Sequence, residues 1–218
     1  MNSYSGYSLY APKQARSAAK LERVLHAARE LLNEKSVAQL NMSEVADRAG
    51  VAVGTVYTRF KDREALLQEL FRRFQAERDE ALEGSFSLNR WRGQTLKDAV
   101  GGVIAITVTH FTESRGLVAA FTEHLRQHPE MLTPEFRERS THLYNRVCEI
   151  FLIFKSEISH PNAEAAVRFA YLTVTSTCQS YFVYPNDSHP TSVRKMGVDL
   201  CESLSDAVYS YLTGSAHV

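Results

Sequence analysis

The amino-acid sequence predicts an all-α protein, with an N-terminal three-helix helix-turn-helix domain followed by a larger helical domain. Almost every periodic segment of the 218 residues repeats its apolar side chains at the 3.6-residue period of a helix. No segment alternates apolar and polar residues for long enough to indicate a strand. The helical segments are short and closely punctuated over Asn41–Phe60, and a change of composition at Gly84 leads into longer helical patterns, which indicates two domains.

The composition is that of a folded, soluble chain. Hydrophobic residues make up 44% of it, and 25 Lys and Arg balance 25 Asp and Glu. The longest apolar run, Val100–Val108, is far shorter than the roughly 20 residues that span a bilayer. The first residues lack the pattern of a secretory signal, and the three cysteines match no zinc or disulfide framework. We therefore expect a cytoplasmic protein with reduced thiols.

The first domain begins with an amphipathic helix over Ala18–Leu32. Asn41, with Glu44 three residues later, predicts a capping box at the start of a short helix. Gly50 should end that helix, because glycine readily adopts the left-handed conformation of a tight helix stop. A second short helix is then expected over Val53–Phe60.

The remaining helices are longer. Asp62 is expected to cap a helix that reaches to about Glu83, and a linker with Gly84, Ser85, Ser87 and Asn89 follows it. Proline residues between the later segments support their boundaries. The helices predicted after the linker are Gln94–Thr112, Gly116–Gln127, Thr133–Ser156, Asn162–Tyr184 and Thr191–Leu212.

The segment Asn41–Phe60 has the spacing of a helix-turn-helix, whose second helix enters the major groove of DNA. Small apolar side chains would form the shared core of the two helices: Val45, Ala46, Ala49, Val51 and Val56. The second helix carries small, hydroxyl and basic side chains, which suit phosphates and base edges. Lys61 and Arg63 extend this edge.

The run AGVAVGTVYTRFKDREALL resembles the DNA-binding signature of the TetR family of bacterial regulators. The resemblance covers about residues 16–72, and a dozen positions agree in register. It implies that Asn41 takes the place of a phosphate-contacting threonine, Tyr57 that of the recognition-helix tyrosine, and Arg63 that of a lysine that grips the DNA backbone. Ala52 stands where the family commonly has serine. The predicted DNA-binding residues are Asn41, Ser43, Ala52, Val53, Gly54, Thr55, Tyr57, Thr58, Arg59, Lys61 and Arg63.

The zero net charge of the chain conceals two opposed halves. Residues 1–73 contain 12 Lys and Arg against 8 Asp and Glu, whereas residues 74–218 contain 13 against 17. A positive N-terminal half mildly favours a nucleic-acid partner, because phosphate binding needs positive potential.

The last two predicted helices carry broad apolar faces, which fit either a homodimer interface or packing inside one subunit. A single helix-turn-helix reads too few base pairs for useful affinity, so we expect a homodimer on a palindromic site. The interface residues predicted from these faces are Tyr181, Phe182, Met196, Leu200, Leu204 and Val208.

Aromatic side chains of the central helices fit either an effector pocket or an ordinary core. The pocket residues predicted are Trp91, His110, Phe111, Phe121, His124, Tyr144, Phe151, Tyr171 and Cys178. His124 and His128 are four residues apart and could present two imidazoles to a metal. Eight histidines make such a pair expected by chance, however, and no third ligand is apparent nearby. We therefore predict neither a metal site nor a cofactor.

These observations predict a ligand-responsive transcriptional regulator. It would act as a repressor that binds a palindromic operator as a homodimer and is released by a small, mostly apolar effector. The expected division is a flexible arm at residues 1–15, a DNA-binding domain at 16–72 and an effector-binding and dimerisation domain at 73–218. The alternative is an all-helical small-molecule-binding protein or enzyme whose N-terminal hairpin is only structural. The sequence contains no paired catalytic groups or nucleophile motif, so we expect no enzyme.

Overall fold

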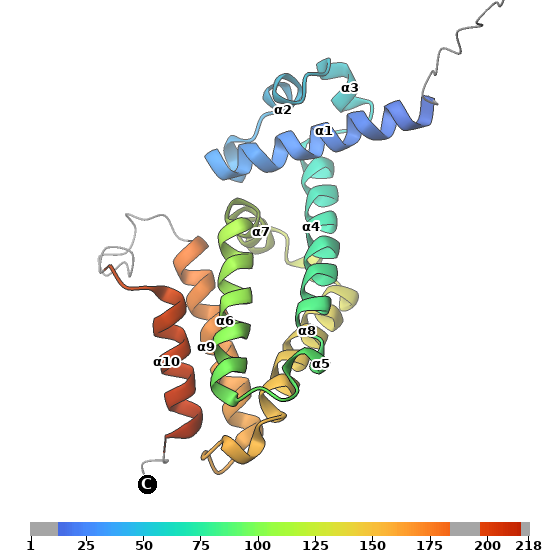
Figure 1. Cartoon of the computed structure of the whole chain (residues 1–218). Helices are drawn as coiled ribbons and strands as arrows, with labels where there is room; N and C mark the ends of the chain where they lie inside the picture. The colour runs from blue at the N-terminus through green and yellow to red at the C-terminus, as the bar shows by residue number, and fades with distance from the viewer. Residues whose placement is uncertain (1–12, 184–196, 215–218) are drawn as a thin grey trace, which may run out of the picture. The chain divides into compact units, whose positions relative to one another are not determined.

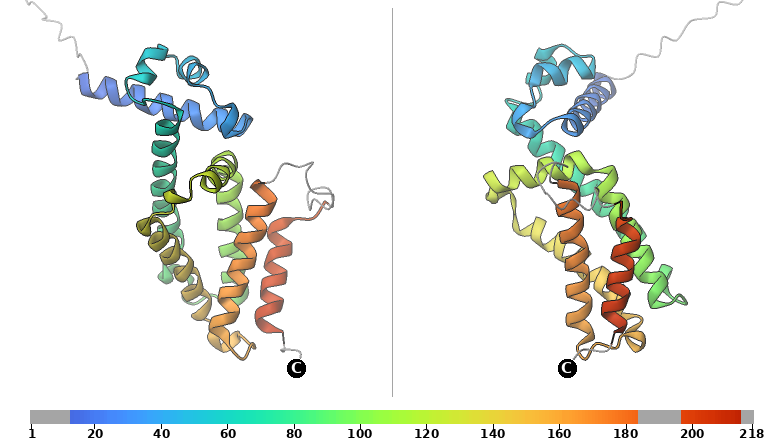
Figure 2. Two further views of the ribbon diagram at one scale, coloured as in Figure 1. Left: turned by 180° about the vertical axis from the view of Figure 1, so that it is seen from behind. Right: turned by 90° about the vertical axis from the view of Figure 1, so that its left-hand side faces the viewer.

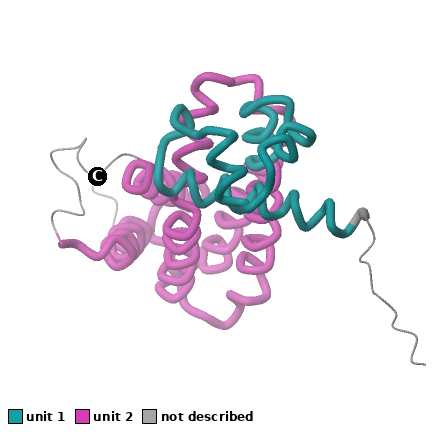
Figure 3. Tube along the Cα trace, turned by 90° about the horizontal axis from the view of Figure 1, so that it is seen from above, with its two compact units in different colours: residues 1–71 teal, residues 72–218 magenta. Residues whose placement is uncertain are grey.

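The computed structural model describes residues 13–183 and 197–214, and every regular element in these ranges is a helix. The predicted all-α class is confirmed. The chain divides between Phe71 and Arg72 into two compact units, which we call the N-terminal and the C-terminal unit (Figure 3). Most of the predicted arm at 1–15 lies outside the described residues, and the chain is already helical from Lys13.

The N-terminal unit packs short helices on one long helix (Figure 1). Helix α1 contacts α2, and α2 contacts α3. The apolar face predicted for the first helix is buried at Val24, Leu25, Ala28, Leu31 and Leu32. Its elements are α1 (Lys13–Glu34), the 3₁₀ turn η1 (Val37–Gln39), α2 (Met42–Ala49), α3 (Val53–Tyr57) and the start of α4 (Arg63–Ser85), which continues into the C-terminal unit.

The C-terminal unit is a bundle in which α6, α9 and α10 lie side by side (Figures 1 and 2). Helix α9 also contacts α7 and α8, so it is the central helix of the core. The elements after α4 are α5 (Leu88–Trp91), α6 (Leu96–Glu113), α7 (Arg115–Gln127), η2 (Pro129–Met131), α8 (Pro134–Leu152), η3 (Lys155–Glu157), α9 (Ala163–Val183) and α10 (Leu200–Thr213).

Side-chain caps fix several helix ends in the C-terminal unit. Thr95 and Asp98 form a capping box at the start of α6, and Thr133 accepts a hydrogen bond at the start of α8. The carboxylate of Glu157 accepts hydrogen bonds from the backbone N–H of Leu96 at 3.2–3.3 Å. Because Glu157 is 61 residues away in sequence, this contact ties η3 to the first turn of α6.

Three predicted boundaries are wrong in the C-terminal unit, and one of them is the end of α8, which lies at Leu152 rather than Ser156. The expected linker is not one, because α4 runs through Ser85 and Leu88–Trp91 form the short helix α5. Helix α10 begins at Leu200 rather than Thr191, since Asp199 has an extended backbone and accepts a 2.8 Å hydrogen bond from the N–H of Glu202. Residues 191–196 of that predicted helix lie outside the described ranges.

None of the helices within residues 13–183 and 197–214 combines the length and the apolar character that crossing a membrane requires.

Candidate DNA-binding site

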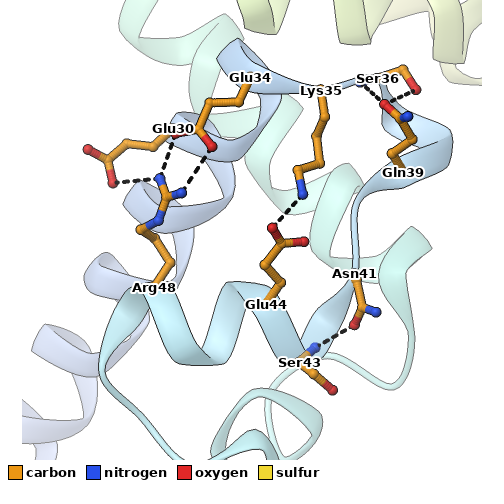
Figure 4. Close-up of polar contacts among 9 residues, drawn as sticks. All are labelled: Glu30, Glu34, Lys35, Ser36, Gln39, Asn41, Ser43, Glu44 and Arg48. Atoms are coloured by element: carbon orange, nitrogen blue, oxygen red, sulfur yellow. Dashed lines mark hydrogen bonds and ion pairs between the residues drawn. The ribbon is translucent and has the colours of Figure 1, made fainter.

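The first helix of the helix-turn-helix, α2, begins at Met42, with Asn41 as its N-cap as predicted. Asn41 has an extended backbone, and its Oδ1 accepts a 2.8 Å hydrogen bond from the backbone N–H of Ser43. The predicted capping box is wrong, because the carboxylate of Glu44 turns to Lys35 instead, with Oε1 2.5 Å from Nζ (Figure 4). Glu44 therefore joins α2 to the residue that follows α1.

The turn after α2 depends on Gly50, as predicted. Its backbone is left-handed, with φ 63° and ψ 43°, and its N–H donates to the carbonyls of Ala46 and Asp47. The N–H of Val51 then donates to Ala46 at 3.0 Å. Such a turn satisfies the last carbonyls of α2 and fixes the direction in which α3 starts.

Helix α3 is shorter than predicted, since it ends at Tyr57 rather than Phe60. The chain continues as a turn in which the N–H groups of Arg59 and Phe60 both donate to the carbonyl of Val56. Val56 is fully buried and Phe60 is nearly so. These two apolar side chains anchor the segment and leave its remaining residues to face outward.

All the predicted DNA-binding residues lie at or near the surface of the N-terminal unit. Val53 and Thr55 are half-buried, and the other nine are exposed. Tyr57 is 51% exposed, which is unusual for so large an aromatic side chain. Gly54 faces open space, because no atom would lie within 4 Å of a Cβ built on it.

Basic side chains border α3 and are held by contacts of their own. The guanidinium of Arg59 donates to Ser17 Oγ of α1, and Arg63 Nη1 donates to the carbonyl of Ala38 at 3.0 Å. Lys61 is almost fully exposed, with its ammonium 3.7 Å from Asp62. Three positively charged side chains, Arg59, Lys61 and Arg63, thus follow α3 directly in the sequence.

An ion-pair brace that the sequence did not reveal joins α1 to α2 (Figure 4). Arg48 donates to both carboxylate oxygens of Glu34, at 2.8 and 3.0 Å, and its Nη1 lies 4.0 Å from Glu30. The bidentate hydrogen bonds lower the pKa of Glu34 and raise that of Arg48. This contact between residues 14 apart orients the helix that supports α3.

The residues predicted for an effector pocket separate into different surroundings in the C-terminal unit. Trp91, Phe151 and Cys178 are packed into the apolar core, and burial raises the pKa of the Cys178 thiol to about 12. Tyr171 is also buried, and its ring lies 5.4 Å from that of the half-buried Tyr144.

The other predicted pocket residues form ring contacts at two further places. His110 stacks on Phe74 at 5.9 Å between ring centroids and meets Phe111 edge-on at 6.2 Å, and Phe111 in turn stacks on Phe182. On α7, Phe121 contacts Phe136, and the buried His124 lies against His128. His110, Phe111 and Tyr144 are therefore the half-buried members of the predicted set.

The imidazole of His110 is neutral at physiological pH. Burial between aromatic rings, together with the smaller effect of the positive charge of Arg78, lowers its pKa to about 4. A neutral imidazole offers one hydrogen-bond donor and one acceptor inside an otherwise apolar lining.

The predicted dimer interface needs correction. Phe182, Leu200, Leu204 and Val208 are buried within the core of a single chain, where they meet the residues of α6 and α9. Tyr181 is half-buried against the same core, and Met196 lies outside the described residues. The apolar periodicity of these helices thus reflects packing inside one subunit, which the sequence left open.

An exposed face that the sequence analysis missed lies on the other side of α9 and α10. Phe169 and Leu172 are 56% and 52% exposed, and Phe169 contacts the exposed ring of Tyr211. The run Phe169–Val183 contains no charged residue, although half of a surface helix should face water. This lack of charge was the signal that could have identified the face.

Comparison with known proteins agrees with this architecture. Residues 24–70 match the family model described as bacterial regulatory proteins, tetR family. A search of curated proteins finds no match.

Solved structures with the same fold cover nearly the whole chain. A TetR-family transcriptional regulator from Mesorhizobium loti has a TM-score of 0.63 at 16% identity, over 90% of this chain and 96% of that one. FadR from Bacillus subtilis, solved with stearoyl-CoA, has a TM-score of 0.55 at 23% identity over 90% and 99%. The fatty acid degradation regulator FadR from Bacillus halodurans has a TM-score of 0.60 at 17% identity over 91% and 96%. Residues 24–70 thus match a domain of the tetR family of bacterial regulatory proteins, and the chain shares its overall fold with these solved structures.

Proposed function

We propose that the protein is a ligand-responsive repressor that binds a palindromic DNA operator as a homodimer. The observation that carries the proposal is the outward face of α3, where an exposed tyrosine lies beside a glycine that faces open space. Packing within the N-terminal unit gives no reason for either residue. A DNA backbone would use both, since tyrosine donates a hydrogen bond to phosphate and glycine permits close approach.

The hydrogen bonds already formed distinguish the roles of the individual side chains. The Oδ1 of Asn41 is used by the cap, so its amide NH₂ is the group that donates to phosphate. The hydroxyl of Thr58 donates to the carbonyl of Gly54 at 2.6 Å, so in this conformation its proton is not offered to a phosphate. Arg63 keeps guanidinium N–H groups beyond the one bound to Ala38, and Lys61 supplies a further cation.

The homodimer would form through the exposed apolar face of α9 and α10, with Phe169, Leu172 and Tyr211 at its centre. Two copies of this helix pair related by a two-fold axis make a four-helix interface. A dimer would carry two copies of α3 to half-sites about 34–36 Å apart, or a multiple of that spacing.

The effector would be a small, mostly apolar molecule that binds in the C-terminal unit. Of the residues predicted for its pocket, His110, Phe111 and Tyr144 are the half-buried ones. Binding that favours a dimer with a different half-site spacing would release the operator. Stearoyl-CoA, the compound bound to FadR from Bacillus subtilis in its crystal structure, is one to include in a screen.

The proposal is tested by replacing the hydroxyl of Tyr57 alone. A hydrogen bond to a charged phosphate is worth about 1.5–3 kcal/mol, and the dimer would make two, so Tyr57→Phe should weaken DNA binding at least tenfold. The measurement is fluorescence anisotropy with duplex DNA at low salt. Tyr209→Phe, in the C-terminal unit, is the matched control and should bind like the unmodified chain. Equal DNA affinity for both variants would mean that α3 is not the contact surface.

A further inference from the structure

His124 and His128, at the end of α7, belong neither to the outward face of α3 nor to the exposed face of α9 and α10. The backbone N–H of His128 donates to the carbonyl of His124 at 2.9 Å, so helical geometry extends to His128. This places the two side chains one turn apart on the same face. Their ring centroids are 4.5 Å apart, and one ring nitrogen of each lies within 4.8 Å of the other.

The two imidazoles differ in exposure in a way that suits ligand binding. His124 is 2% exposed, so its ring is held by the side chains packed around it. His128 is half-buried, so an ion can reach the pair from solvent on its side. A fixed ligand beside an accessible one reduces the conformational entropy lost when the ion binds.

A carboxylate supports the second histidine. The Nδ1 of His128 lies 3.0 Å from Oε1 of Glu130, in the short 3₁₀ turn that follows α7. A hydrogen bond from Nδ1–H to this carboxylate would leave the lone pair of the ring on Nε2. Histidines that bind metals usually donate their other ring N–H to a carboxylate in this way, which orients the ring and makes it a better ligand.

We propose that His124 and His128 bind one divalent late transition-metal ion, with Zn²⁺ as the reference case. Two nitrogens on the same tetrahedral Zn²⁺, each at about 2.0–2.1 Å, lie roughly 3.4 Å apart. The ring nitrogens lie within 4.8 Å of each other, so binding requires the His128 side chain to rotate toward His124. Imidazole ligands select Zn²⁺, Ni²⁺ and Cu²⁺ over Mg²⁺, which prefers oxygen. Water molecules complete the coordination.

Such an ion would be a second ligand of the C-terminal unit, in addition to the proposed apolar effector. It would bind the last turn of α7 and the start of η2, which are in contact. Because the ion binds the folded chain only, it would raise the thermal stability of that unit. This inference does not depend on DNA binding, so the two proposals can fail separately.

Isothermal titration of the untagged full-length chain with Zn²⁺ tests the site, with Mg²⁺ titrated in parallel. We expect one Zn²⁺ per chain and no binding of Mg²⁺. His128→Ala should lower the Zn²⁺ affinity at least tenfold, and Glu130→Gln should lower it by about ten- to a hundredfold. The matched control is His142→Ala, an exposed histidine on α8 that should leave the affinity unchanged.

Thermal unfolding with and without Zn²⁺ shows for each variant whether the chain is folded and whether the ion stabilises it. His128 is half-buried at the end of a helix, so His128→Ala should fold and unfold at a similar temperature without metal. Zn²⁺ should raise the midpoint of the unmodified chain and of His142→Ala but not that of His128→Ala. The inference is overturned if the unmodified chain binds no Zn²⁺, or if His128→Ala binds it equally well.

Discussion

On α3, some residues stabilise the fold, whereas others would be explained only by DNA binding. Val56 is fully buried and anchors the helix, whereas Gly54 has no neighbour within 4 Å of a Cβ built on it. In the free protein, alanine would be the better residue there, because glycine costs up to about 1 kcal/mol in a helix. The presence of glycine at this position is consistent with an external partner that approaches closely.

Gly54→Ala should therefore keep or slightly raise the unfolding temperature and weaken DNA binding by tenfold or more. The added methyl group would fit the free chain but collide with a closely approaching DNA backbone. Thermal unfolding and DNA anisotropy measure the two effects on the same sample. Gly84→Ala, another helical glycine with open space around it, is the control and should change neither markedly. Unchanged DNA affinity in Gly54→Ala would remove the main support for α3 as the contact helix.

His110 makes the stability of the C-terminal unit depend on pH. Its pKa is about 4 in the folded chain and 6.5 as the ordinary value, so the unfolded chain binds an extra proton between these two pH values. The free energy of unfolding should then fall as the pH drops from about 6.5 to 4.

Replacing the titrating group isolates this contribution. His110→Phe preserves an aromatic ring against Phe74 but removes the titrating group. Over that pH range its free energy of unfolding should fall by about 1–2 kcal/mol less than that of the unmodified chain, after allowance for partial exposure. Denaturant unfolding at pH 7 and pH 4.5 provides the comparison. If the two proteins lose stability equally, the imidazole is not desolvated as described.

At the scale of elements, α5 and α6 meet at a point where only glycine fits. A Cβ on Gly102 would lie 2.7 Å from two ring atoms of Trp91, which is fully buried. The neighbouring Gly101 has no atom within 4 Å of such a Cβ. A side chain at position 102 would therefore collide with Trp91, whereas position 101 has room for one.

Gly102→Ala should destabilise the protein by about 1–3 kcal/mol, because the methyl group overfills a packed contact. Gly101→Ala should be neutral or stabilising, since alanine favours the helix. Denaturant unfolding followed by circular dichroism measures both. Trp91 is the only tryptophan of the chain, so its fluorescence reports whether the ring moves in Gly102→Ala. Equal stability of the two variants would contradict the described packing of α5 on α6.

The sequence predicted elements well where local chemistry decides them and poorly where distant contacts do. Asn41 and Gly50 determine the ends of α2 through their own backbone preferences, so both were predicted correctly. Glu44 was predicted as a capping residue, but Lys35, nine residues away, forms an ion pair with it. The start of α6 likewise depends on Glu157, 61 residues later, which no local pattern could reveal.

The candidate sites, too, were predicted well where a local motif defines them and poorly where the packing partner is distant in sequence. The proposed DNA-facing residues could be predicted because Gly54 and Tyr57 belong to a contiguous motif with a fixed register. Helical periodicity on α10 correctly marked Leu204 and Val208 as one apolar face. It could not tell whether that face meets the same chain or a second copy, because both would bury the same pattern.

For the whole molecule, the outer face of α9 and α10 is proposed to hold two chains together. Leu172→Glu should convert the dimer into a folded monomer, because the interface would have to bury an unpaired carboxylate. Light scattering coupled to size-exclusion chromatography measures the mass, and circular dichroism the fold. Ile153→Glu, an exposed apolar residue at the end of α8, is the control and should remain dimeric. A dimeric Leu172→Glu would place the interface elsewhere.

The central claim is that the chain reads DNA as a symmetric pair through α3. Its most direct test is selection of bound duplexes from a random pool, with the unmodified chain and Gly54→Ala compared under the same salt. The unmodified chain should enrich two inverted half-sites whose centres are separated by about 10–10.5 base pairs or a multiple of that number, and Gly54→Ala should enrich them weakly or not at all. No enrichment above the starting pool, or the same enrichment by both proteins, would contradict the account.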